Sequence, residues 1–542
     1  MKLFIFGIIC ALWQVSHQNP MGHWTLMPHI LVVEVDGTLG QQPLSCLEFP
    51  EDLMGRGDMN EDIFWRRNGV EEEQTGNTYL LQLEESLGGG NYTCHCKDGS
   101  LLNYTVVLIQ EDETNRRRIL VKNGQEDYLE CSAQNYNGEF HCSWTWHSSR
   151  VGKVAFIKAR RVTDNSGTQC SVDASGQDWT CSSGQSNFRC SVDDSGRRIL
   201  CVDEHHCPYA EETQHIHINV YVTTEHFLVE NYSKHFYLSE ILKPDKVNIS
   251  KVNTTVIEWS YPSSWSSPYS YFPLTFQIAQ LRRGCKRCDN PCTGLKATKT
   301  LTVHSTDICQ FEVKHKAKAI CVRAKDAFCD SQWSEWSHIR LKKHKKNKKS
   351  KRQQDKGGGG SGGGGSGGGG SVPLMGTGPM TDTCVLYAHT LLQNITDTLT
   401  QEDLFSGIDC TKQSVELNME TNTPSVCAPQ KSTCSGIINS QFDQDSCLTN
   451  IGEDLHHFYK FLAAQPDPDS LLAPTVLLSL RELMENCFKW SLPTDLAENE
   501  AADRPSTYDE RLSLCKVLKG FHVRSITINR AIAYLNSGEH TK

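Results

Sequence analysis

Apolar residues recur at every third or fourth position near the end of the chain. This is the period of one face of an α-helix, so the segment predicts a long amphipathic helix. Three earlier segments share the period, and prolines such as Pro466 and Pro493 separate the segments. Four helices with long connections predict an all-α up-up-down-down four-helix bundle over residues 372–542. The last stripe consists of Leu514, Leu518, Phe521, Ser525, Ile528, Ile532 and Leu535, and the earlier segments are Thr383–Leu399, Cys447–Ala464 and Ser470–Cys487.

The first 340 residues follow a different pattern. Short runs rich in β-branched and aromatic residues alternate with turn residues, and helical periodicity is almost absent. This pattern predicts several β-sandwich domains. The clearest runs are His29–Val35, Tyr79–Leu83, Leu102–Ile109, His215–Val222 and Val256–Trp259.

The two patterns are separated by Gly357–Ser371, three perfect Gly-Gly-Gly-Gly-Ser repeats. Such a segment behaves as a flexible coil with a root-mean-square span of roughly 20 Å and a full reach of about 50 Å. The regularity indicates a synthetic linker that joins two natural chains. A second mature N-terminus is therefore expected near Val372.

The N-terminus has the pattern of a cleaved signal peptide. Lys2 precedes an apolar run from Leu3 to Trp13, which predicts a signal peptide over residues 1–18. No later run of about 18–20 apolar residues predicts a membrane anchor, so we expect a secreted, extracellular protein without membrane insertion. Six Asn-x-Ser/Thr sites fit secretion as glycosylation positions: Asn91, Asn103, Asn231, Asn248, Asn253 and Asn394.

The cysteine content agrees with an oxidising compartment. The chain has 24 cysteines, and Cys10 belongs to the predicted signal peptide. The odd remainder leaves at least one thiol outside intramolecular pairs. Cys285, Cys288 and Cys292 have zinc-ligand spacing, and His205-His206 stands beside Cys207, but disulfides are favoured over a metal in a secreted chain. The pairing stays open among Cys285, Cys288, Cys292, Cys309, Cys321 and Cys329.

The first domain, residues 19–110, has immunoglobulin spacing. Cys46 and Cys94 bracket Trp65, and Tyr92 lies two residues before the second cysteine. This arrangement is typical of an inter-sheet disulfide with an indole packed on it and of a tyrosine corner. We therefore expect an immunoglobulin-like domain.

Two further domains carry motifs of fibronectin type III modules. In residues 111–243, Cys131 and Cys142 precede Trp144, which resembles the cysteine hairpin of cytokine-receptor ectodomains. In residues 244–341, a Trp-Ser-x-Trp-Ser box follows the strand-like stretch that contains Arg323, and its indoles can sandwich that guanidinium. A structural role in folding is expected for this box, which consists of Trp333, Ser334, Glu335, Trp336 and Ser337.

These motifs together resemble the interleukin-12 family. The part before the linker is similar to its β subunits, with Glu-Asn-Tyr-Ser from Glu230, Lys-Pro-Asp from Lys243 and the stretch from Ser270 to Phe276. The part after the linker is similar to its α subunits, above all in the ending Ile526–Ser537. The extra cysteines and the basic tail indicate a non-mammalian vertebrate source.

The resemblance implies a subunit interface. In the family, an arginine on the last α-subunit helix enters a pocket of the β subunit, and the matching residue here is Arg530. The matching acid is Asp326, with Tyr136 and Phe328 as aromatic walls; Phe328 stands where the family has tyrosine. A desolvated guanidinium needs a carboxylate, and aromatic walls exclude water. The residues alone would favour a surface arginine.

The resemblance also implies disulfides. An inter-subunit bridge is expected between Cys207 and Cys434, and Cys96 is the expected leftover thiol. Cys487 is proposed to replace the missing family partner of Cys384. The remaining implied pairs are Cys410–Cys515, Cys427–Cys447, Cys170–Cys201 and, as an added pair, Cys181–Cys190.

For function, the resemblance implies a cytokine that bridges the interleukin-12 receptor β1 and β2 chains and promotes interferon-γ responses in T and natural killer cells. The region from Trp24 to Val35 is expected to meet β1, and exposed faces of the bundle to meet β2. Two alternatives remain: a receptor-like decoy or antagonist, separated by a reporter-cell assay, and an interleukin-23-like cytokine, disfavoured by the ending from Thr527 to Ser537.

A basic run of residues 342–352 closes the first part, within a tail over residues 342–356. It is either a solvated tail or a heparan sulfate site driven by charge. Outside the Gly/Ser repeats the chain lacks GxSxG, and it lacks HExxH and P-loop motifs, so we expect no enzyme, no cofactor and no nucleic-acid partner. The basic side chains are Lys342, Lys343, Lys345, Lys346, Lys348, Lys349, Lys351 and Arg352.

Overall fold

The computed structural model describes most of the sandwich and helical regions. The predicted signal peptide, Cys285, Cys288, the basic run and the Gly/Ser segment lie outside the described residues, so the expectations on them stay predictions. The described residues are 22–35, 40–47, 63–83, 88–111, 118–162, 168–173, 175–183, 186–253, 256–281, 292, 300–303, 309–313, 318–341, 380–434, 437–438, 442–467, 470–490 and 505–541.

The chain forms two compact units, each built from several segments. The first unit consists of Met1–Cys131, His141–Glu204 and Ile216–His235. The second consists of Ser132–Phe140, His205–His215 and Phe236–Lys542. The second unit therefore contains residues from both sides of the linker, and it includes β strands as well as every long helix that the structure describes.

The first unit begins with two facing sheets. The disulfide Cys46–Cys94 joins them, since Cys46 directly follows β3 and Cys94 belongs to β7. Trp65 is buried and its indole N–H donates to the Gly76 carbonyl at 2.8 Å, while the Tyr92 hydroxyl donates to the Gly88 carbonyl at 2.8 Å. The first sheet has the order β1 (His23–Met27), β2 (Ile30–Val35), β8 (Leu101–Glu111), β7 (Gly90–Cys96), β4 (Ile63–Arg67), β5 (Val70–Thr75), and the second pairs β3 (Gly40–Ser45) with β6 (Thr78–Leu83).

The following strands carry a series of cross-strand disulfides. Cys170 of β14 faces Cys181 of β15, and Cys190 of β16 faces Cys201 of β17, with Cα–Cα distances of 4.1 and 4.0 Å. One sheet has the order β10 (Glu130–Ser132), β11 (Glu139–Ser143), β17 (Arg198–Asp203), β16 (Ser186–Val192), β15 (Asp178–Ser183), β14 (Gln169–Val172). A two-stranded sheet pairs β9 (Leu120–Val121) with β12 (Thr145–Trp146). A three-stranded sheet has the order β13 (Gly152–Arg161), β18 (Ile216–Thr224), β19 (Val229–Phe236).

This pairing corrects one expectation. The pairs Cys170–Cys201 and Cys181–Cys190 are wrong, because the β14–β15 and β16–β17 hairpins set each cysteine opposite its own hairpin partner. In the β15–β16 ladder, Cys181 instead faces Phe188. Cys131–Cys142 forms as expected and has the same sequence separation of 11 as the two corrected pairs.

The β part of the second unit carries the Trp-Ser-x-Trp-Ser box. The guanidinium carbon of Arg323 lies 4.6 Å from the ring centroids of both Trp333 and Trp336. The Ser334 hydroxyl accepts a hydrogen bond from Ala324 N–H, and the Ser337 hydroxyl donates one to the Val247 carbonyl. The box is therefore hydrogen-bonded to neighbouring segments of the domain. Its sheets are β20 (Asn248–Lys251), β21 (Val256–Ser260), β24 (Gln310–Glu312), and β23 (Thr300–Val303), β22 (Leu274–Leu281), β25 (Ala319–Asp326), β26 (Ser337–Arg340); the short helix α2 spans Leu238–Ile241.

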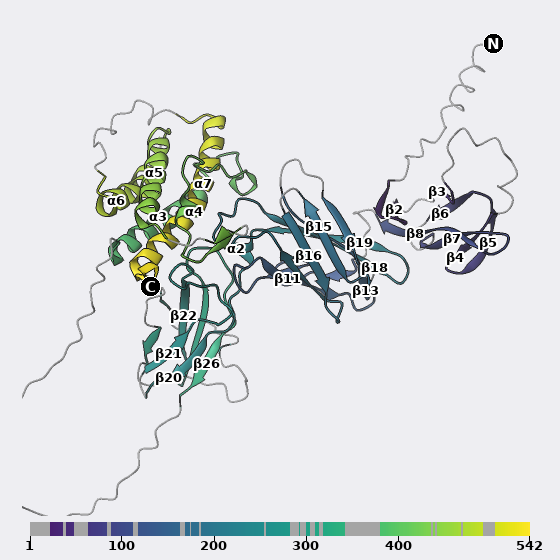
Figure 1. The fold of residues 1–542 in the computed structure, drawn as a ribbon, viewed down its shortest axis with the longest axis horizontal. Helices are drawn as coiled ribbons and strands as arrows, with labels where there is room; N and C mark the ends of the chain where they lie inside the picture. Colours follow the sequence, from purple (N-terminus) through teal and green to yellow (C-terminus); the bar gives the residue numbers. More distant parts are fainter. Residues whose placement is uncertain are drawn as a thin grey trace, which may run out of the picture. The chain divides into compact units, whose positions relative to one another are not determined.

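The long helices of the second unit are drawn in Figure 1. Their buried side chains form one apolar core. The Asp443 cap starts α5 a turn earlier than expected, and the third segment opens as a π-turn, Ala473–Leu477, before α6. A capping box between Thr507 and Glu510 starts the last helix, and Gly538 ends it with φ of 68°. The elements are α3 (Asp382–Leu399), η2 (Cys410–Lys412), α4 (Thr423–Val426), β27 (Thr433–Cys434), β28 (Ile437–Ile438), α5 (Gln444–Ala463), α6 (Leu478–Cys487), α7 (Tyr508–Ser537) and η5 (Glu539–Thr541). Within the described part of the chain, no helix has the length and apolarity needed to span a membrane.

Candidate docking site around the last helix

Arg530 of α7 is buried against residues that precede the linker. It is 7% exposed, and one terminal nitrogen, Nη2, donates to the Tyr136 hydroxyl at 2.6 Å. The same nitrogen lies 3.9 Å from Oδ2 of Asp326, which is fully buried. The structure thus brings together the arginine, the acid and the tyrosine that the resemblance implied.

The Tyr136 hydroxyl bridges the two charges. It accepts from Arg530 and donates to Asp326 Oδ2 at 2.9 Å. Burial raises the pKa of Tyr136 well above its usual value, so the hydroxyl keeps the proton that it donates. The short contact of the arginine is therefore to a neutral oxygen, and the carboxylate acts one hydrogen bond further away.

Asp326 is held in place by backbone groups. Its Oδ1 accepts N–H bonds from Phe328 at 2.8 Å and Cys329 at 2.9 Å, and its own N–H donates to the Ser331 hydroxyl. These bonds satisfy a carboxylate that has no access to water. The position of the acid is therefore held by hydrogen bonds that do not involve the arginine.

Two aromatic faces cover the arginine. The guanidinium carbon lies 4.5 Å from the Tyr136 ring centroid and 5.1 Å from that of Phe272. Phe272 belongs to the Ser270–Phe276 stretch but was not predicted as a wall. The expected wall, Phe328, is half-buried, and its ring centroid lies 6.3 Å from that of His389 on α3.

A buried thiol completes the pocket. Cys329 Sγ lies 3.3 Å from the Tyr136 hydroxyl and 3.5 Å from Arg530 Nη2. Burial, with Asp326 nearby, raises the pKa of this thiol to about 12, so it is neutral at physiological pH. Cys329 forms no disulfide in the structure, and neither does Cys96, the expected leftover thiol.

A second buried arginine lies six residues earlier on the same helix. Arg524 is 2% exposed and binds Glu211 with two hydrogen bonds, Nε to Oε1 at 2.6 Å and Nη2 to Oε2 at 3.2 Å. Burial raises the pKa of Glu211, and the Arg524 charge opposes that shift. Sequence reasoning missed this pair, because six residues correspond to about 120° of rotation around the helix axis, so the role of Arg530 does not indicate one for Arg524.

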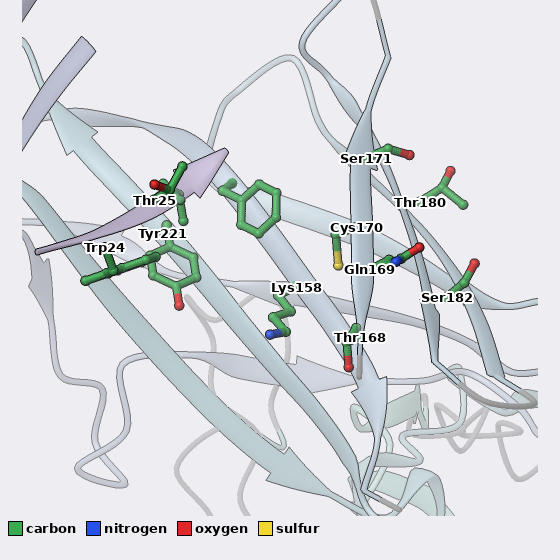
Figure 2. Close-up of a pocket in the computed structure, with 12 residues that line it drawn as sticks. Trp24, Thr25, Lys158, Thr168, Gln169, Cys170, Ser171, Thr180, Ser182 and Tyr221 are labelled. Carbon is green, nitrogen blue, oxygen red and sulfur yellow. The ribbon is translucent and has the colours of Figure 1, made fainter. Parts of the chain in front are cut away.

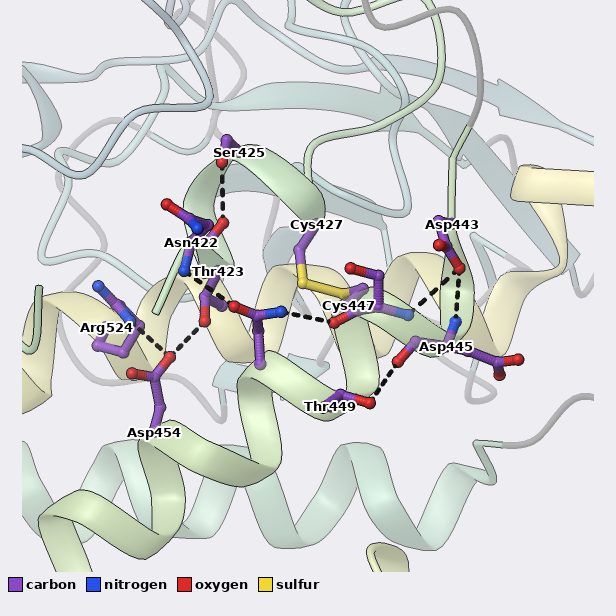
Figure 3. The surroundings of a disulfide bond; sticks show 12 residues. Asn422, Thr423, Ser425, Cys427, Asp443, Asp445, Cys447, Thr449, Asp454 and Arg524 are labelled. Carbon is purple, nitrogen blue, oxygen red and sulfur yellow. Dashed lines mark hydrogen bonds and ion pairs between the residues drawn. A yellow bond between two sulfur atoms is a disulfide. The ribbon is translucent and has the colours of Figure 1, made fainter. Parts of the chain in front are cut away.

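The far side of Arg524 contacts the helical part itself. Its Nη1 donates to Asp454 of α5 and to the Thr421 hydroxyl, as part of the cluster in Figure 3. Asp454 is fully buried and also accepts from Asn418 and Thr423. Hydrogen bonds from residues of the helical part itself therefore orient Arg524 toward Glu211.

A disulfide also joins the segment that contains Glu211 to the helical part. Cys207 pairs with Cys434 of β27, with a Cα–Cα distance of 5.2 Å. Glu211 lies four residues after Cys207. Covalent and ionic contacts therefore hold one segment, His205–His215, against the helical part.

Three further disulfides stabilise the helical part. Cys427–Cys447 ties α5 to the end of α4 (Figure 3). The structure also pairs Cys410 with Cys515 and Cys384 with Cys487, so Cys487 does take the place proposed for it. All three match the expected connectivity.

The remaining candidate residues are placed as follows. Cys292 pairs with Cys321, which removes one of the three suggested zinc ligands, and no group of three or more metal-ligating side chains occurs among the described residues. Asn91 and Asn248 are exposed residues of strands, and Asn253 is exposed just after the end of β20. The amide nitrogens of Asn103 and Asn394 donate to the carbonyls of Cys46 and Thr475.

Fold and site define a β-sheet part that holds a helical part through two buried arginines and a disulfide. The family of the cytokine interleukin-12p40 C-terminus matches residues 126–224. The interleukin-12 subunit beta of Marmota monax is 30% identical over 332 residues, which cover 58% of this chain and 91% of that protein. Those of Homo sapiens and Sigmodon hispidus are both 27% identical, and the matches cover 58% and 59% of this chain and 92% and 93% of theirs. The chain belongs, through its N-terminal part, to the interleukin-12 subunit beta family.

Proposed function

We propose that the chain is a secreted, interleukin-12-like cytokine in single-chain form. A β-type subunit is joined by the synthetic linker, residues 357–371, to an α-type up-up-down-down four-helix bundle. The observation that carries this proposal is Arg530 in the pocket of Tyr136, Asp326 and Phe272. Such a buried contact between the two parts is expected of natural partners and not of two proteins joined only by a tether.

The proposed domain order is an immunoglobulin domain (19–110), two fibronectin type III domains (111–243 and 244–341) and a basic tail (342–356). The Cys46–Cys94 bridge with Trp65, and the Tyr92 hydroxyl bond, support the first assignment. The stacking of Arg323 between Trp333 and Trp336 supports the last. The extra cysteine hairpins suggest a non-mammalian vertebrate source.

The proposed partners are the interleukin-12 receptor β1 and β2 chains, and the proposed outcome is interferon-γ production by T and natural killer cells. The first domain around Trp24 would meet β1, and the exposed faces of the helices would meet β2. The basic run would bind heparan sulfate, and elution from heparin unchanged by its deletion would count against this.

Reporter cells that express β1, β2 or both chains test the proposal. Purified monomer should signal only in cells with both chains, before and after proteolytic cleavage of the linker. Signalling that requires neither chain would refute it. Inhibition of a native ligand without signalling would instead identify the decoy.

A further inference from the structure

A cavity of about 680 Å³ opens in the first unit between β1 and the strands β13, β14 and β15 (Figure 2). One wall is aromatic: the Tyr221 ring centroid lies 5.7 Å from that of Trp24 and 5.9 Å from that of Phe156. The other wall is polar and includes hydroxyl and amide side chains of Gln169 and Thr180. The volume falls in the range of ligand sites, roughly 300–1,000 Å³.

Lys158 is the charged residue among those that line the cavity, and it lies between the two walls in Figure 2. Its side chain is half-buried, and within the described residues it forms no ion pair. An ammonium group without a carboxylate partner keeps three N–H donors available. The cavity thus combines aromatic faces, hydroxyls and free donors, which suits the C–H faces and oxygen acceptors of a sugar.

A glycosylation sequence lies beside the aromatic wall. Strands β18 and β19 form a hairpin in which Thr224 N–H donates to the Leu228 carbonyl, and His217 contacts His235 at 6.0 Å between centroids. Both contacts define one register, which places Asn231 opposite Tyr221. The neighbours of Asn231 in sequence, Glu230 and Tyr232, are buried, so alternation directs Asn231 to the face that carries Tyr221.

We propose that the first sugars of an N-linked glycan on Asn231 fold over Tyr221 and occupy this cavity. Adjacent strands lie about 4.8 Å apart, so β13 with Lys158 is only about 10 Å from the attachment point. The glycan's two N-acetylglucosamines stack on Tyr221 and Trp24, and their hydroxyl and acetamido oxygens accept from Lys158. Covalent attachment supplies an effective concentration on the order of millimolar, which a free saccharide does not have.

This inference rests on the secretory route of the proposed function but is tested without receptors, so the two can fail independently. Protein carrying high-mannose glycans is treated, without denaturation, with an endoglycosidase that cleaves between the two core N-acetylglucosamines. Peptide mapping then gives the release rate at each asparagine. The denatured protein provides the reference for occupancy and for unhindered cleavage.

The matched variants are Lys158→Met, which removes a donor in the cavity, and Lys153→Met, an exposed lysine on the same strand. Release at Asn231 should be slow in the native protein and in Lys153→Met, and about tenfold faster in Lys158→Met. A Trp24→Ala variant should also accelerate release. Absence of a glycan on Asn231, or equal native rates in Lys158→Met and Lys153→Met, would overturn the proposal.

Discussion

Arg524 and Glu211 form a bidentate ion pair in which both side chains are at least 96% buried. The two residues lie on opposite sides of the linker in sequence, yet their nitrogen and oxygen atoms approach to 2.6 Å. Burying such a pair sacrifices the hydration of both charges, so its net stabilisation is small. Its selective effect is large, because a partner that lacked Arg524 would leave the Glu211 carboxylate buried without a charged partner, and one that lacked Glu211 would leave Arg524 with Asp454 alone.

Glu211→Gln should therefore weaken docking strongly. The change removes two hydrogen bonds to a charged partner but leaves Arg524 paired with Asp454, and the expected cost is about 2–5 kcal/mol of docking free energy. The measurement is the association of linker-cleaved protein in which Cys207 and Cys434 are serine. Glu335→Gln is the control, because the Glu335–Lys243 bridge is exposed and should contribute at most about 1 kcal/mol. Equal effects of the two changes would contradict the interpretation.

Gly520 is required by close backbone packing on α7. A Cβ atom there would lie 1.7 Å from the Glu416 carbonyl oxygen, which is a backbone atom and cannot rotate away. Gly520→Ala should lower the free energy of unfolding by about 1–3 kcal/mol or more, measured by chemical denaturation.

Gly452→Ala on α5 is the matched control for that change. Its Cβ would meet nothing nearer than 3.6 Å, and alanine favours helix by about 1 kcal/mol over glycine. This variant should be neutral or more stable. If both alanines had the same effect, the close contact with Glu416 would not be the cause.

The hairpin disulfides give a covalent test of the first unit. Peptide mapping without reduction should yield Cys170 linked to Cys181 and Cys190 linked to Cys201. Each pair is opposite in a two-stranded ladder, where Cα–Cα distances of about 4.0–4.1 Å allow a direct bridge. Peptides that link Cys170 to Cys201 would refute the strand order.

His522 should make the helical part sensitive to acid. Burial lowers the pKa of His522 from 6.5 to about 4, and its Nε2 contacts the Thr396 hydroxyl at 3.2 Å. Between these values the unfolded chain binds a proton that the folded chain does not, so stability falls as pH falls from 6.5 to about 4. Urea unfolding at several pH values should show a smaller decline for His522→Gln. If stability declined equally in the His522→Gln variant, other titrating groups would be the cause of the acid sensitivity.

Local patterns predicted much of the fold. The three- and four-residue period located the helices within a few residues, because each helix buries one stripe in a shared core. Two cysteine pairs of the second domain, Cys170–Cys201 and Cys181–Cys190, were predicted incorrectly, since pairing depends on which strands are neighbours. Spacing along the chain contains that information only when the hairpin turns are assigned first.

The docking site was predicted in part. Arg530, Asp326 and Tyr136 came from resemblance, and no periodicity distinguishes Arg530 from a surface arginine. Phe272 and the Arg524–Glu211 pair were missed because their meeting depends on contacts across hundreds of residues. The bridging role of the Tyr136 hydroxyl depends on the exact distances between three side chains, which no sequence pattern indicates.

The central claim is that native contacts, not the linker, hold the two parts together. Sedimentation of linker-cleaved protein with Cys207→Ser and Cys434→Ser tests it most directly. The parts should associate, Arg530→Ala should weaken association by about 2–5 kcal/mol, and Lys516→Ala on the same helix should leave it unchanged. Parts that separate completely without Arg530→Ala, or that associate equally well with it, would contradict the account.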